Sequence, residues 1–365
     1  MMRPPRPSEI VLAVAFATMI GAVLGRTRPN SHSHVPPSAD PWSVSHEVPP
    51  APSPIMVSVD AGPPAEDASI PPVVVDSGPT GYTVDDDHEP EPPVGDTTDI
   101  ETLLAFVPMT HRDEASLAIA RRWLGPGSNH GNQGNPALST HAISREQCKK
   151  GLEGVVLQTS LDREICGGPW EVPIHTGDPR SATTCIDAFE YPNRPCVLPM
   201  VFTHPIADRQ LCELQGKRLC TQEEWNTACE ADPKGGPASK YAYGDELDLS
   251  VCNTGKGKSP RCDVDRGLWK TCSTDDVPTG SYPKCRSRLG VFDQHGNLAE
   301  AMTRLEKGVN YVQLKGSAWF YDGAMYADTC RFDPRWHVDP VAESWHTNYH
   351  LGFRCCRSVT PLSSR

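Results

Sequence analysis

Apolar residues recur with helical spacing over Ile100–Phe106 and over Glu114–Leu124, where a Gly-Pro-Gly sequence ends the second segment. Two more helices are expected, over Pro205–Gln215 and Thr221–Glu230. The second of these opens with a Thr and has a Glu three residues later, which makes a capping box. Elsewhere beyond residue 148 the chain shows short strand patterns and long loops rich in Gly, Pro, Asn and Asp. The pattern therefore predicts an α+β domain with little regular secondary structure.

One apolar stretch is continuous rather than periodic, and it spans residues 10–25 behind Arg3 and Arg6. A basic start followed by such a run is typical of a signal peptide. The run is shorter than the roughly 20 residues that a membrane span needs. Residues 1–26 are thus predicted to be either a cleaved signal peptide or an uncleaved membrane anchor. Arg26 stands where a lipoprotein signal would need cysteine, so lipidation there is excluded.

Residues 27–98 cannot build a core, because 16 of their 72 positions are proline and most others are acidic or small. Proline fixes φ and removes a hydrogen-bond donor, so we expect an extended, disordered linker. The run Asp85–Asp87 is interpreted as solvated linker charge. Residues 99–147 are expected to form a partly helical lead-in, and residues 148–358 the folded domain.

All 14 cysteines lie between Cys148 and Cys356. Such a density indicates disulfides and an exported domain that faces an oxidising, extracytoplasmic compartment, either secreted or anchored in a membrane. The formal net charge of −12 argues against nucleic acid and anionic membrane surfaces as partners.

Six segments, in the order and at the spacing expected, resemble the formylglycine-generating enzyme family, also called the sulfatase-modifying factor family. They begin at residues 185, 216, 243, 290, 316 and 351 and read CIDAFEYPN, GKRL with TQEEW, YGDELD, GVFD with GN, GSAW, and LGFRC. The resemblance covers residues 165–358. It implies a fold related to C-type lectins, with two helices and much irregular chain.

The resemblance also implies two disulfides. A cysteine on the first helix of the family bridges to the final Gly-Phe-Arg-Cys motif, which gives Cys212–Cys355 here. A cysteine at the end of the second helix gives Cys229–Cys330. The other ten cysteines cannot be paired from the sequence, except that Cys355 and Cys356 should take different partners because a vicinal bridge is strained.

Catalytic members of the family oxidise a substrate cysteine to formylglycine with two copper-binding cysteines after the Gly-Ser motif. Phe320 and Met325 occupy the corresponding positions. A phenyl ring cannot ligate copper, and one thioether is a poor substitute for a thiolate pair. Ala299 and Ala301 also replace two tryptophans of a family motif. We therefore expect no copper site and no formylglycine reaction; a displaced cysteine pair is the alternative.

The resemblance further implies a structural calcium site, whose oxygen ligands would be the Asp293 and Glu300 carboxylates with the Gly296 and Leu298 carbonyls. Carboxylates and carbonyls gathered within eight residues suit calcium, although a hydrogen-bonded turn without metal would look similar. A second family site would begin at Asn253 and Thr254. Its downstream ligand stays open among Asp263, Asp265 and Asp275.

Histidines are the remaining candidates for chemistry. His346 and His350 are four residues apart, which on a helix would put both on one face, as a metal pair needs. The surrounding residues favour a polar loop instead, and His337 and His295 are isolated candidates. The acidic pair Asp187 and Glu190 is interpreted as structural.

These observations lead to one main hypothesis. The chain is predicted to be a non-catalytic binding or structural module at the cell envelope, with an unidentified protein or carbohydrate ligand. The rival is an enzyme, either an oxidase with a displaced cysteine pair or a metal-dependent activity around His346 and His350. The aromatic residues considered for ligand recognition are Trp319, Phe320, Tyr321, Tyr326, Trp336 and Trp345.

Overall fold

The structure is a computed structural model, and it describes residues 81–84, 99–125, 127, 130–265, 267–324, 326–336 and 338–362. The predicted signal peptide or anchor, nearly all of the predicted linker, Met325 and His337 lie outside the described residues. None of the helices in the described ranges is long and apolar enough to cross a bilayer.

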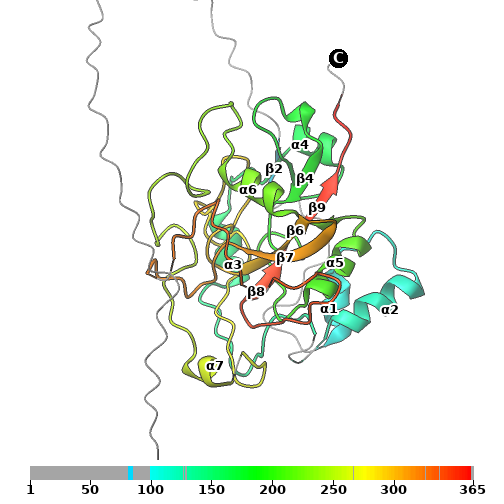
Figure 1. The fold of residues 1–365 in the computed structure, drawn as a ribbon, viewed down its shortest axis with the longest axis vertical. Coiled ribbons are helices and arrows are strands. Elements are labelled where there is room, and N and C mark those ends of the chain that lie inside the picture. Colours follow the sequence, from blue (N-terminus) through cyan, green and yellow to red (C-terminus); the bar gives the residue numbers. More distant parts are fainter. Residues whose placement is uncertain are drawn as a thin grey trace, which may run out of the picture. The chain divides into compact units, whose positions relative to one another are not determined.

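The lead-in folds onto the domain that follows it. Helices α1 (Ile100–Phe106) and α2 (Glu114–Trp123) begin at aspartate N-caps, Asp99 and Asp113, as local sequence favours. Helix α2 lies beside α5 (Pro205–Leu214), and α1 packs against α2 (Figure 1). Their apolar faces share one core with the domain, which includes Leu103, Leu104, Val107, Trp123, Tyr191, Leu211 and Phe353. Residues of the lead-in therefore belong to the main core.

The two helices predicted beyond residue 148 are confirmed as α5 and α6 (Gln222–Glu230). The structure adds three short helices that were not predicted, α3 (Arg145–Gly151), α4 (Ser160–Cys166) and α7 (Pro260–Asp265). A capping box at the start of α3 and another at the start of α4 are the sequence features that could have predicted these two helices. The helices are too short to show apolar periodicity, and a 3₁₀ turn spans Pro179–Ser181.

Two small sheets carry the domain. In the first, the strands lie in the order β3-β4-β9-β5, and every neighbouring pair is antiparallel. Its strands are β3 (Glu171–Pro173), β4 (Thr184–Asp187), β5 (Arg218–Leu219) and β9 (Cys355–Ser358). The C-terminal strand β9 thus lies at the centre of the sheet, between strands formed much earlier in the chain.

The second sheet has the order β7-β6-β8. Strands β6 (Ala299–Glu306) and β7 (Val309–Lys315) form a hairpin, drawn in orange in Figure 1. Strand β8 (Leu351–Phe353) runs parallel to β6. A separate two-stranded ladder pairs β1 (Gly81–Tyr82) with β2 (Gln158–Thr159). The prediction of a disordered linker over 27–98 is therefore wrong for residues 81–84, because their main chain pairs with β2 and Val84 is buried in the core. Short helices around small sheets give the expected α+β fold.

Seven disulfides connect these elements. Two of them, Cys212–Cys355 and Cys229–Cys330, are the bridges that the resemblance implies, and Cys356 takes a different partner from Cys355. Bridges between cysteines that are far apart in the sequence restrict the unfolded chain most. Each of these raises the free energy of unfolding by about 2–4 kcal/mol. The remaining pairs are Cys148–Cys196, Cys166–Cys185, Cys220–Cys356, Cys252–Cys285 and Cys262–Cys272.

Candidate functional site

Phe320 stands at the position where the resemblance places the first redox cysteine, and aromatic rings surround it. Its ring centroid lies 5.1 Å from that of His350, 5.7 Å from that of Trp319 and 6.2 Å from that of Tyr349. The ammonium group of Lys258 lies 4.4 Å from the same centroid, a cation–π contact. The position is thus filled by hydrocarbon, which offers a soft metal no ligand.

The cysteines offer no replacement thiol. All 14 are paired in disulfides, and each is at most 3% exposed. A catalytic cysteine must reach the substrate as a thiolate in a partly exposed, electropositive environment. The bridged and buried pairs of this domain lack that access, so none of them has the surroundings of a displaced redox centre.

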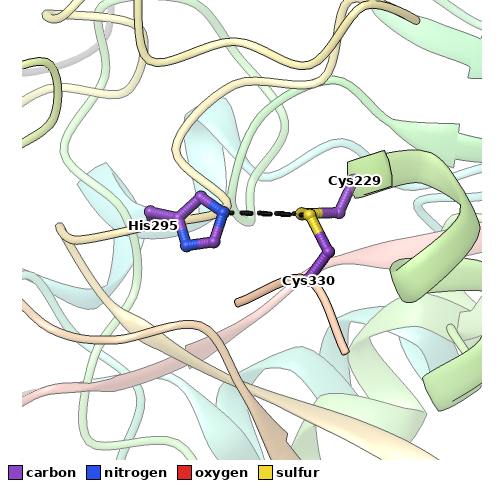
Figure 2. A group of neighbouring side chains, drawn as sticks. All are labelled: Cys229, His295 and Cys330. Carbon is purple, nitrogen blue, oxygen red and sulfur yellow. Dashed lines mark hydrogen bonds between the residues drawn. A yellow bond between two sulfur atoms is a disulfide. The ribbon is translucent and has the colours of Figure 1, made fainter. Parts of the chain in front are cut away.

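One histidine lies against a disulfide. Figure 2 shows the imidazole of His295 pointing at the Cys229–Cys330 bridge. His295 Nε2 is 3.5 Å from Cys229 Sγ and 4.0 Å from Cys330 Sγ. The two sulfur atoms are bonded to each other, so neither is a thiolate ligand. The Nε2 atom accepts a hydrogen bond from Ala242 N at 3.0 Å, and Nδ1 lies 3.1 Å from Asp328 Oδ2. The imidazole is therefore fixed by polar partners in the core.

His346 and His350 lie in a segment without helix. The polar-loop interpretation of this segment is therefore the one that matches the structure. His350 packs edge-on against Phe320 and Tyr349. Within the described residues, the group of Cys229, His295 and Cys330 is the one cluster of three metal-ligating side chains, and it includes neither of these histidines.

Three carboxylates are buried around one guanidinium. Glu300 accepts hydrogen bonds from Arg354 and from Trp225 Nε1, and Glu190 accepts from the main-chain N–H of Leu298. Burial, followed by the nearby negative charges, raises the pKa of Glu190 well above its usual range. Burial likewise raises the pKa of Asp293 to about 7. The cluster holds more negative than positive charge when its carboxyl groups are ionised.

Asp187 and Glu190 have different partners, which agrees with structural roles. Asp187 Oδ1 accepts from Lys217 Nζ at 2.5 Å and from Asn193 Nδ2 at 3.0 Å. Glu190 instead accepts from Asn297 Nδ2 at 2.6 Å. Asp187 therefore ties the end of β4 to the chain before β5, and Glu190 ties the bend after β4 to the loop before β6.

Comparison with known proteins adds to this geometry. Residues 186–359 match the family described as the sulfatase-modifying factor enzyme 1-like domain. Two curated relatives are both named inactive C-alpha-formylglycine-generating enzyme 2. The mouse protein (Mus musculus) is 29% identical over 40% of this chain and 45% of its own length, and the cattle protein (Bos taurus) is 28% identical over 40% and 46%.

Residues 186–359 form a formylglycine-generating-enzyme-like domain. The chain spans a little under half the length of the curated relatives it matches. Among solved structures, the crystal structure of CarF is 20% identical over 40% of this chain and 48% of its own, with a TM-score of 0.27, and adds nothing to the assignment. The α+β architecture is that of the C-type-lectin-like fold of this family.

Three of the four expected calcium ligands of the formylglycine-generating-enzyme-like domain, Asp293, Gly296 and Leu298, lie on a tightly curled loop, whereas Glu300 lies on β6. Asp293, Gly296 and Asn297 all have positive φ, and a Cβ atom at Gly296 would lie 2.4 Å from the carbonyl oxygen of Asn253. Both Glu300 oxygens accept from Arg354. A divalent cation here would offset the excess negative charge, and Asp293 with main-chain carbonyls would be its ligands. Glu300 differs from its expected role as a ligand, because both of its oxygens are bound to the arginine.

The second expected site begins beside this loop. Asn253 O accepts from Asn297 N at 2.9 Å, and Asn253 Nδ2 lies 3.4 Å from the carbonyl of Asp275. The Thr254 hydroxyl donates to Leu249 O at 2.6 Å. Of the three aspartates that competed in sequence, the structure brings Asp275 next to Asn253; the side chains of the other two lie outside the described part.

Of the six aromatic candidates, Phe320 and Tyr326 are half-buried, and the other four separate into core and surface. Trp319 and Tyr321 are at most 2% exposed, so they belong to the core rather than to a recognition surface. Trp336 is 49% exposed and Trp345 is 61% exposed. The Trp345 ring also packs 5.4 Å from that of His204, which holds it against the domain.

Proposed function

We propose that this chain is an exported, non-catalytic protein of the sulfatase-modifying factor type that works as a binding or structural module at the cell envelope. The observation that carries the proposal is Phe320 at the position of a redox cysteine. Loss of that thiolate removes the soft ligand that copper(I) needs. The names of the mouse and cattle relatives, which call them inactive, point the same way.

Export is supported by the disulfides and by the N-terminal sequence. Seven bridges in one domain suit an oxidising compartment and would be reduced in most cytosols. The basic start and apolar run of residues 1–26 supply either a signal peptide or an anchor. The proline-rich residues 27–80 then lie in the sequence between that terminus and β1, the first described strand that pairs with the domain.

A binding role is supported by exposed aromatic side chains on a rigid, bridged frame. Trp336 and Trp345 present large apolar surfaces to solvent, and such residues are enriched where proteins recognise ligands. Their partner would be a protein or a carbohydrate. A purely structural module without a specific ligand would not require either tryptophan to be exposed to solvent.

The rival enzymatic functions have less support. A displaced cysteine pair would have to be one of seven buried disulfides, and a metal centre would have to assemble from histidines in a loop. A structural calcium ion remains part of the proposal, held at Asp293. Its role would be to stabilise the curled loop rather than to act on a substrate.

The decisive experiment incubates the secreted protein with copper(I) and a peptide that carries a sulfatase-type cysteine motif, and detects the aldehyde product by mass spectrometry. We expect no aldehyde from the natural sequence. An active formylglycine-generating enzyme, assayed in parallel, is the positive control. Aldehyde formation that is abolished by adding a copper chelator would overturn the proposal.

A further inference from the structure

A cavity of about 480 Å³ lies between the lead-in and the four-stranded sheet, and Phe320 is not among its lining residues. Nine of its 15 lining residues precede residue 186, so the family match does not account for most of its wall. The apolar part of the lining includes Met109 and Trp170. The volume falls in the range of small-molecule sites.

The floor of the cavity is a buried ion-pair network. Lys217 Nζ lies 2.5 Å from Asp187 Oδ1 and 3.0 Å from Glu171 Oε1. Arg357 Nε lies 2.9 Å from Glu171 Oε2. Two cationic groups thus face two carboxylates, and this part of the wall is close to neutral.

Two further arginines line the cavity beside this network. Arg163 is half-buried on α4, with its guanidinium 5.9 Å from the Tyr82 ring centroid, and Arg194 is only 7% exposed. Among the described residues of the lining, Glu171 is the single acidic one. A concave, basic site in a chain of net charge −12 concentrates positive potential where an anion would bind.

One buried glutamine fixes the wall in place. Gln158 is 2% exposed, and its Nε2 donates to Gly168 O at 2.9 Å and to Glu171 O at 2.8 Å. Its Oε1 accepts from Trp170 N at 3.1 Å, where the backbone has a φ of 54°. The tryptophan wall is therefore held in position before any ligand arrives, which reduces the entropy cost of binding.

We propose that this cavity binds a small organic anion. A carboxylate or phosphate group would meet Arg163 and Arg194, since a guanidinium matches the planar geometry of oxyanions. The apolar body of the ligand would pack on Trp170 and Met109. The site uses other elements than the Phe320 region, so it stands whether or not catalysis has been lost.

The test uses the full secreted chain and three probes of similar size: benzoate, phenyl phosphate and neutral benzamide. Titration calorimetry should give at least tenfold tighter binding for one of the two anions than for benzamide. Arg163→Gln should weaken that binding at least fivefold. Arg335→Gln is the matched control, because Arg335 is exposed and lies outside the cavity.

A second variant, Thr110→Trp, places a large ring at an exposed position of the lining and should abolish binding without touching the ion-pair floor. An unchanged melting temperature shows that each variant is folded. Equal affinity for benzamide, or wild-type affinity in either Arg163→Gln or Thr110→Trp, overturns the proposal. None of these results depends on the aldehyde assay, so the two proposals fail separately.

Discussion

Arg354 and Glu300 form a two-point ion pair inside the domain, with Nε–Oε2 at 2.6 Å and Nη2–Oε1 at 2.5 Å, and both side chains are fully buried. The guanidinium also donates to Phe292 O at 2.9 Å and to Asp187 O at 3.1 Å. One residue of the Gly-Phe-Arg-Cys motif therefore links β6, β4 and the curled loop.

Arg354→Met should destabilise the domain strongly, because it leaves Glu300 buried without its counterion. We expect a loss of about 3–5 kcal/mol in the free energy of unfolding. Chemical denaturation without reductant measures it. Arg335→Met, at an exposed ion pair, is the control and should change stability by less than about 0.5 kcal/mol. A loss below about 1 kcal/mol for Arg354→Met would show that the pair is not needed.

The stability of the protein should fall as pH rises from about 4 to 7 in the presence of EDTA. Burial raises the pKa of Asp293 to about 7 and that of Asp187 to about 6, whereas an unfolded aspartate titrates near 3.9. Between these values the folded state binds more protons than the unfolded state, so raising the pH favours unfolding. Asp293→Asn, which stays neutral, should flatten this slope in denaturation curves taken across the range.

Calcium should oppose that loss. An ion at Asp293 would neutralise the ionised carboxylates, so millimolar calcium at pH 7.5 should raise the melting temperature above its value in EDTA. Magnesium is the matched control, because it prefers shorter bonds and retains its water. Asp293→Asn should reduce the calcium response. Identical melting temperatures in calcium and EDTA would count against the metal and leave a protonated carboxyl in its place.

Thiol titration of the denatured, unreduced protein should find no free cysteine, because all 14 are bridged. Replacing Cys212 and Cys355 together by alanine should lower the free energy of unfolding by about 2–4 kcal/mol. The Cys262–Cys272 pair closes a loop with a separation of only 10 residues, so its removal should cost less. Two or more reactive thiols in the natural protein would contradict the seven bridges of the structure.

Much of the fold followed from the sequence because its determinants are local. The capping box at Thr221 and Glu224 fixes the start of α6 within a few residues, and Asp99 and Asp113 do the same for the lead-in helices. The two bridges implied by the family resemblance, and Phe320 at a cysteine position, also needed only an ordered set of motifs.

Tertiary structure decided what depends on residues far apart in the chain. The sequence treated Glu190 and Asp293 separately, and only folding brings them to Arg354, where burial raises the pKa of both carboxyl groups. Folding also pairs the ten cysteines that the sequence left unassigned, and it places Arg163 and Arg194 in the lining of one cavity. Spacing along a chain fixes helix faces and caps, whereas burial and long-range juxtaposition arise only when the core closes.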